Sequence, residues 1–191
     1  MIYRLIISAI ILSATLLPGW GSCASADDSD DLLEYKIKTA FLYNFAKFVA
    51  WPSTDTINTS RVFTIGIIAS PEFASTAKLL QDKNVKGAPV KIIFFEPYEE
   101  LLPCNMLFIG VDDETLILNV IDRFKDSPVL TVADSSGFAS QGGIINFITV
   151  DDTIRFEINP EAAETKHLKI SSKLLSLARI VGTAGSEKAE K

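Results

Sequence analysis

The apolar positions between Leu32 and Ala50 recur at intervals of three and four residues, which predicts an α-helix. Pro52 ends it, because the residue before a proline resists the helical conformation. Asn44 falls beside Phe41 and Phe48 on the helical wheel, so the sequence predicts a buried amide that needs a hydrogen-bond partner. We expect Asn44 to fasten irregular backbone, such as the 134–143 loop, to the core; a direct ligand contact is the alternative. The predicted buried stripe contains Leu33, Ile37, Phe41, Phe45 and Phe48, and Trp51 is a further structural residue.

The period then changes to that of buried strands. Runs rich in β-branched residues at 62–68, 90–95, 106–109 and 129–132 predict four strands. Helical segments at 71–81 and 114–124, and a short helix or turn at 98–102, connect them. Strands that alternate with helices predict a mainly parallel sheet covered on both faces.

The last third of the chain departs from this alternation. Residues 144–150 and 153–158 predict an antiparallel hairpin that turns at Asp151-Asp152. Its opposed pairs are predicted to put Ile145, Phe147, Phe156 and Ile158 on an apolar face, and Asn146, Arg155, Glu157 and Asn159 on a polar face. Asn159 then caps a helix, and helical spacing continues over 170–181.

The fold class that follows is α/β, with a mixed, mainly parallel central sheet flanked by helices and a C-terminal antiparallel hairpin. We expect a single domain over residues 27–181 and a frayed tail over 182–191.

Residues 1–26 have the build of a secretory signal peptide: Arg4, an apolar run from Leu5 to Leu17, and small residues before Asp27. The apolar run is too short for an ordinary membrane-spanning helix. Cleavage after Ala26 would release an exported chain. The alternatives are lipidation at Cys23, within a Gly-Ser-Cys-Ala sequence, and an uncleaved anchor.

Charge and composition exclude several classes of function. The net charge of −6, with 18 basic and 24 acidic side chains and no Lys/Arg cluster, argues against nucleic acid as a partner. One histidine, His167, and no nucleophile motif leave no common catalytic set, so we expect no enzyme activity. Cys104 has no intramolecular cysteine partner once Cys23 is removed or acylated; it is interpreted as a buried apolar residue, with an intermolecular bridge or reactive thiol as alternatives. We predict neither a metal site nor a cofactor.

The glycine-rich 134–143 loop follows the fourth strand, where ligands bind in open α/β sheets. One interpretation is a crossover into the hairpin, with Phe138 as a core plug; the other is a recognition loop. Arg155 and Glu157 are likewise either a surface ion pair or part of a covered polar network. The candidate partner- or ligand-binding residues are Asp134, Gly137, Phe138, Gly142, Gly143, Asn146, Arg155, Glu157 and Asn159.

Four segments together resemble the YfiR/HmsC-like periplasmic family. They are KTAFLYNFAKFVAWP (38–52), GFASQGGIINF (137–147), RFEIN (155–159) and ISSKLL (170–175). The resemblance implies a periplasmic α/β protein that binds the periplasmic sensor segment of an inner-membrane diguanylate cyclase, represses it, and lowers cyclic di-GMP and biofilm formation. Two departures are Ala50, where an acid is expected, and the missing cysteine pair, which puts disulfide-based redox control in doubt.

A periplasmic small-molecule receptor, with a pocket over the 134–143 loop, is the alternative function. A pocket lined by the polar hairpin residues would favour the receptor. An exposed apolar patch beside Phe138 would favour a protein partner. The sequence leaves a homodimer open.

Overall fold

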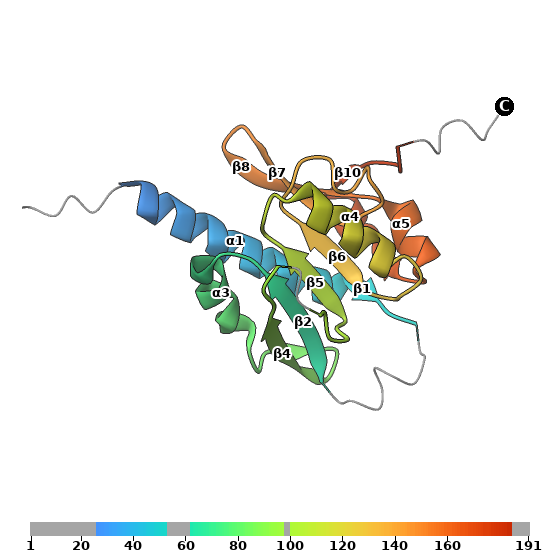
Figure 1. Cartoon of the computed structure of the whole chain (residues 1–191), viewed down its shortest axis with the longest axis horizontal. Coiled ribbons are helices and arrows are strands. Elements are labelled where there is room, and N and C mark those ends of the chain that lie inside the picture. Colours follow the sequence, from blue (N-terminus) through green and yellow to red (C-terminus); the bar gives the residue numbers. More distant parts are fainter. Residues whose placement is uncertain (1–25, 53–61, 98–99, 185–191) are drawn as a thin grey trace, which may run out of the picture.

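The computed structural model describes residues 26–52, 62–97 and 100–184 (Figure 1). Four segments lie outside the described residues. They are the predicted leader up to residue 25, residues 53–61 after Pro52, residues 98–99 at the start of the predicted 98–102 turn, and the tail from residue 185.

An eight-stranded sheet forms the centre of the described residues, in the order β10-β8-β7-β6-β5-β2-β4-β3. Strands β2, β4, β5, β6 and β7 run parallel, β8 and β3 run antiparallel to their neighbours β7 and β4, and β10 is parallel to β8. The predicted mixed, mainly parallel α/β sheet is confirmed. The strands are β2 (Phe63–Ile68), β3 (Asn84–Val85), β4 (Ala88–Phe94), β5 (Met106–Ile109), β6 (Leu130–Ala133), β7 (Ile145–Val150), β8 (Thr153–Ile158) and β10 (Arg179–Ile180).

Helices cover both faces of this sheet (Figure 1). One face packs against α1 (Ala26–Phe48), α3 (Pro71–Ala77, extended by a 3-10 turn, Lys78–Leu80), α5 (Pro160–Thr165) and α6 (Ser172–Leu175). The other face packs against α4 (Glu114–Arg123) and the 134–143 loop, which contributes Phe138 to that core. The sheet therefore separates two apolar cores.

The predicted buried stripe of α1 is confirmed at Phe45 and in part at Phe41, and is wrong at its other positions. Leu33 is 58% exposed and Phe48 39% exposed, and Asn44 is exposed as well, without a side-chain hydrogen bond among the described residues. The buried face lies roughly a quarter to a third of a turn away around the helix. Apolar side chains occupy most of the circumference, so periodicity alone did not single out the face that packs on the sheet. The residues on the buried side are Lys38, Thr39, Leu42, Phe45, Ala46 and Val49, with Phe41 half-buried.

The helix predicted over 170–181 is confirmed only at Ser172–Leu175 and is wrong on either side of it. A short strand, β9 (Lys169–Ile170), pairs with β1 (Val49–Ala50), and α6 follows after Ser171 caps it. The chain then forms β10, where the Val181 N–H donates to the Ile158 carbonyl at 2.9 Å. The open edge of β8 thus determines the conformation of a segment whose local spacing is helical.

The hairpin prediction is confirmed pair by pair. Asn146 lies opposite Glu157, Ile148 opposite Arg155, and Val150 opposite Thr153. Asp151 (φ 48°) and Asp152 (φ 54°) both adopt left-handed conformations, as a two-residue type I′ turn requires. The apolar face of the hairpin packs against α1, where Phe45 contacts Phe156 with ring centroids 5.0 Å apart.

Candidate functional site

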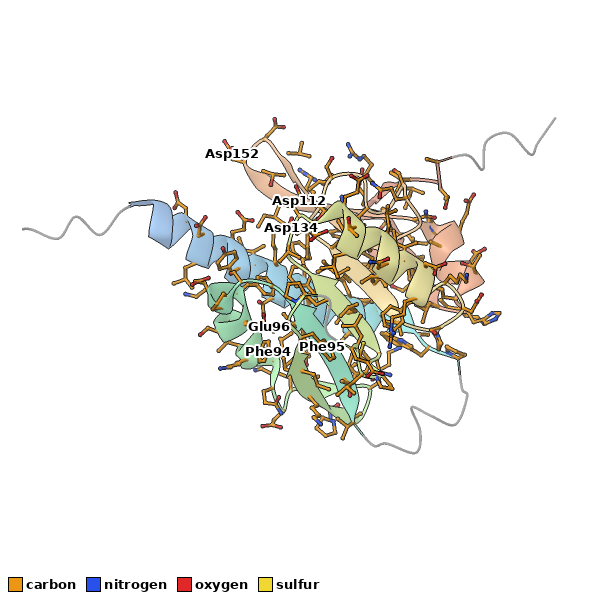
Figure 2. All side chains as sticks on the ribbon, viewed as in Figure 1. Phe94, Phe95, Glu96, Asp112, Asp134 and Asp152 are labelled. Atoms are coloured by element: carbon orange, nitrogen blue, oxygen red, sulfur yellow. The ribbon has the colours of Figure 1, made fainter. Side chains whose placement is uncertain are left out.

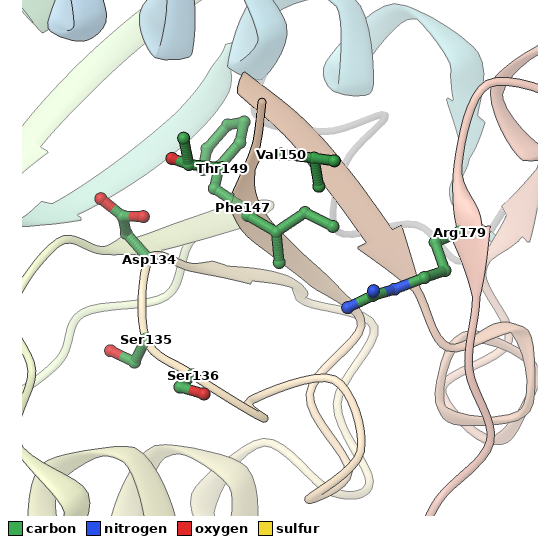
Figure 3. A pocket seen from close by; sticks show the side chains of 8 residues that line it. Asp134, Ser135, Ser136, Phe147, Thr149, Val150 and Arg179 are labelled. Atoms are coloured by element: carbon green, nitrogen blue, oxygen red, sulfur yellow. The ribbon is translucent and has the colours of Figure 1, made fainter. Parts of the chain in front are cut away.

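An open pocket of about 360 Å³ lies where β6 ends, between the start of the 134–143 loop and the outer half of β7 (Figure 3). This is the carboxyl end of the parallel strands, the place where open α/β sheets commonly bind ligands. Its lining residues are Asp134, Ser135, Ser136, Phe147, Ile148, Thr149, Val150 and Arg179.

A buried cation supports the Asp134 side of the pocket. The Lys38 ammonium comes from α1 and donates to the carboxylates of Asp134 and Glu34. Burial lowers the pKa of Lys38, but the hydrogen bonds and charges of the two carboxylates outweigh it, and the net effect raises that pKa above its ordinary value. Lys38 therefore remains charged at neutral pH and fixes Asp134, whose side chain is 32% exposed.

A second charged pair lies on the polar face of the hairpin. Arg179 on β10 donates from Nε to the Glu157 Oε1 at 2.8 Å, and Asn146 donates from Nδ2 to Oε2 at 3.3 Å. Glu157 and Asn146 are buried, whereas the Arg179 side chain is 62% exposed and borders the pocket. Asn146 Oδ1 is buried without a hydrogen-bond partner among the described residues. Arg155 is exposed, and the partner of Glu157 is Arg179 rather than Arg155.

Asn159 holds the 134–143 loop in place. Its Nδ2 donates to the Ala139 carbonyl at 2.8 Å and to Thr183 Oγ1 at 2.9 Å, while its Oδ1 accepts from the Ala162 N–H at 3.0 Å and caps α5. Asn159 is completely buried. The anchoring role predicted for Asn44 therefore belongs to Asn159.

The glycines of this loop serve its packing. Gly137 (φ 76°) and Gly142 (φ 107°) adopt conformations that L side chains rarely take. A Cβ on Gly143 would lie 2.2 Å from the Phe138 ring, which is 0% exposed. The interpretation of Phe138 as a core plug is confirmed, and an exposed apolar patch built on its ring is excluded.

The structure thus divides the predicted site residues into three groups. Asp134 lines the pocket. Glu157 binds Arg179, which also lines the pocket, and Asn146 donates a hydrogen bond to Glu157. A second group gives the loop its conformation or holds it in place: Gly137, Phe138, Gly142, Gly143 and Asn159. Arg155 is exposed and does not line the pocket. Residues that the sequence did not single out are Glu34, Lys38, Ser135, Ser136, Thr149 and Arg179. Lys38 could have been found, because it shares the helical face of Leu42 and Phe45.

A second hollow, of about 620 Å³, borders β1 and β9 and includes Trp51 and His167. The Trp51 indole N–H donates to the Asn105 carbonyl at 3.1 Å, and its ring meets Phe63 edge-on, which supports a structural role. Among the residues that the structure describes, no three His, Cys, Asp or Glu side chains gather as a metal site would require.

The model of one protein family matches residues 35–179, a span that includes Lys38, the 134–143 loop, the hairpin and Arg179. The chain belongs to the YfiR/HmsC-like family. This family comprises periplasmic regulatory proteins, as opposed to enzymes, that are associated with membrane diguanylate cyclases. The comparison with curated proteins gives no match. None of the helices within the described residues has the length and apolar character that crossing a membrane takes.

Proposed function

We propose that this YfiR/HmsC-like protein binds the periplasmic segment of an inner-membrane diguanylate cyclase and represses it, which lowers cyclic di-GMP and biofilm formation. The observation that carries the proposal is the family match over residues 35–179. Residues 1–26 act as a cleaved signal peptide in this proposal, and Cys23 lipidation is the alternative that mass spectrometry of the exported protein distinguishes.

The end of the molecule that carries the pocket is the proposed contact surface. The hairpin projects beyond the body of the sheet there (Figure 1), and Asp134, Thr149 and Arg179 are accessible from solvent. Repression is a shift of population, because a regulator that binds the inactive conformation of the cyclase better than the active one lowers the active fraction. No reaction by this protein is required.

Cyclic di-GMP levels test the proposal. Deletion of the gene should raise cyclic di-GMP, and the exported wild-type chain should restore the lower level. Arg179→Gln should weaken repression, whereas Arg155→Gln, which removes the same charge from the neighbouring strand outside the pocket, should leave it intact. The periplasmic segment of the target cyclase should co-purify with the chain. Unchanged cyclic di-GMP after deletion, with no cyclase segment retained, would refute the proposal.

A small-molecule receptor is the second candidate, favoured by the pocket itself, which pairs a carboxylate, Asp134, with a guanidinium, Arg179. Such a pocket suits a ligand with both a cationic and an anionic group. Native mass spectrometry of protein isolated from the periplasm would reveal a co-purifying compound, and its loss in Arg179→Gln would support the receptor.

A further inference from the structure

The β7–β8 hairpin extends farther than the strands on either side of it. Its ladder runs from Ile145–Ile158 to Val150–Thr153, but β6 pairs with β7 only at Ile145 and Asn146. On the other side, β10 pairs with β8 only at Glu157 and Ile158. Residues 147–150 of β7 therefore continue past the last residue of β6 that pairs with them.

The chain after β6 bends away from β7 and opens the pocket. The Asp134 N–H donates to the Ile109 carbonyl at 3.0 Å, on the β5 side, and the Ser135 hydroxyl donates to the Val111 carbonyl at 3.2 Å. Both bonds direct residues 134–136 toward β5. The space that a longer β6 would occupy is the pocket of Figure 3.

The geometry of the hairpin decides which backbone groups face that space. In a hairpin with a two-residue turn, the residues that flank the turn exchange both backbone hydrogen bonds, and every second pair does so thereafter. Val150, Ile148 and Asn146 therefore bond to β8. The backbone groups of Phe147 and Thr149 are directed to the opposite edge, and the edge from Phe147 onward borders the pocket.

We infer that the pocket edge of β7, residues 147–150, receives an extended segment of the partner protein as an added strand, in the position that β6 leaves. The added segment pairs with the backbone of Thr149 and carries a basic side chain that meets Asp134. The identity of the partner rests on the proposed function; the mode of recognition rests on the strand edge and the pocket. Strand addition of this kind obtains affinity from main-chain hydrogen bonds and specificity from side-chain pockets.

Charge selects a basic segment over an acidic one. Lys38 is shared between two carboxylates, Glu34 and Asp134, so that cluster is net negative. Arg179, which also lines the pocket, is offset by its ion pair with Glu157. Asp112, Asp134 and Asp152 lie toward the same end of the molecule (Figure 2), and the chain carries a net charge of −6. A basic strand would be attracted to this end and an acidic strand repelled.

Two pairs of variants test the inference. Thr149→Pro removes an N–H at the pocket edge, while Ile154→Pro removes the equivalent outward N–H on the β8 edge of the same hairpin. Asp134→Asn removes the pocket carboxylate. Asp152→Asn makes the same charge change in the turn, where Asn also tolerates a positive φ, and so measures the general, solvent-screened attraction of this end for a cation apart from the contact at Asp134. Circular dichroism and urea unfolding establish that each variant is folded.

Binding of the exported chain is measured by fluorescence anisotropy with two probes. One is the periplasmic segment of the target cyclase; the other is a set of nine-residue Val/Thr-alternating peptides with Lys, Glu or Pro at the centre. We expect Thr149→Pro and Asp134→Asn to weaken binding about tenfold each, as the loss of one well-formed polar contact implies, and both controls to stay within about twofold. The Lys peptide should bind better than the Glu and Pro peptides.

Hydrogen–deuterium exchange of the wild-type complex gives a readout that needs no variant. Protection of the Thr149 amide on binding supports the added strand. A cyclase complex that leaves residues 147–150 unprotected overturns the inference and leaves the proposed function standing. Binding of the Lys peptide without the cyclase segment supports the inference and overturns the proposed function. Failure of both probes overturns both.

Discussion

Asn159 should be one of the most sensitive polar positions in the molecule, because one side chain joins three segments. Replacement by alanine removes the cap of α5, which costs about 1 kcal/mol. It also removes the donor to the Ala139 carbonyl, and a buried carbonyl without a partner costs about 1 to 3 kcal/mol. We expect Asn159→Ala to lower the free energy of unfolding by about 3 kcal/mol.

Two variants separate the cap from the anchor. Asn159→Asp keeps an oxygen for the Ala162 N–H but faces the Ala139 carbonyl with a second acceptor, so at least about 2 kcal/mol should be lost. Ser70→Ala removes a helix cap alone, at α3, and should cost about 1 kcal/mol. Urea unfolding followed by circular dichroism measures all three. An Asn159→Ala protein no less stable than Ser70→Ala would refute the anchoring role.

Three further positions give independent predictions. Gly143→Ala should lower the free energy of unfolding by about 2 kcal/mol, because the new Cβ would lie 2.2 Å from the Phe138 ring. Gly87→Ala is the control: Gly87 has a φ of 90° and no atom within 4 Å of the new Cβ, so this change should cost about 1 kcal/mol. Chemical unfolding of the two variants compares these losses. Lys166 is buried with no partner for Nζ among the described residues, and burial lowers its pKa, so Lys166→Met should raise stability by about 1 to 2 kcal/mol at pH 7. The parent protein should gain stability as pH rises from the lowered folded pKa to the ordinary one, and an unfolding series against pH should show this slope absent in the variant. Cys104 is half-buried, and the desolvation of its thiol raises its pKa to about 11, so at pH 8 the thiol should react with a disulfide reagent about a hundredfold more slowly in the folded chain than in urea; equal rates would contradict the raised pKa.

The parts of the fold that were predicted correctly are those that local chemistry determines. The hairpin register follows from a two-residue gap and strict alternation, and Asp151 and Asp152 take the conformations that this turn needs. Ser70 and Asn159 begin helices because their side chains accept from backbone N–H groups three residues later. Each of these features involves only neighbours along the chain.

The errors arose where contacts between distant segments of the chain determine the local structure. The apolar residues of α1 cover too much of its surface for spacing to identify the buried face, and the contact with the sheet selected Leu42 and Ala46 over Leu33 and Phe48. Residues 179–180 became a strand because β8 offered an open edge. The helical spacing of that segment was genuine but weaker than the tertiary pairing.

The site shows the same dependence on long-range contacts. Lys38 and Asp134 are 96 residues apart in the sequence, and Arg179 reaches Glu157 from another strand. The sequence identified the acceptors of these pairs, Asp134 and Glu157, but not the cations that hold them. A lysine among the apolar residues of one helical face is a usable signal, because a charge on a packed face must have a partner elsewhere in the chain.

The two interpretations of the 134–143 loop apply to different residues in it. From Gly137 onward the loop is fixed by the Phe138 plug, the Gly143 contact and the Asn159 hydrogen bonds, so changes there act through stability. Residues 134–136 border the pocket where the chain bends away from β7, so substitutions at Asp134 and Ser136 change the chemistry of the pocket, and Glu34 remains as a partner of Lys38 when Asp134 is replaced. A buried, rigid half that positions an accessible half is how a loop can be both a core element and a recognition surface.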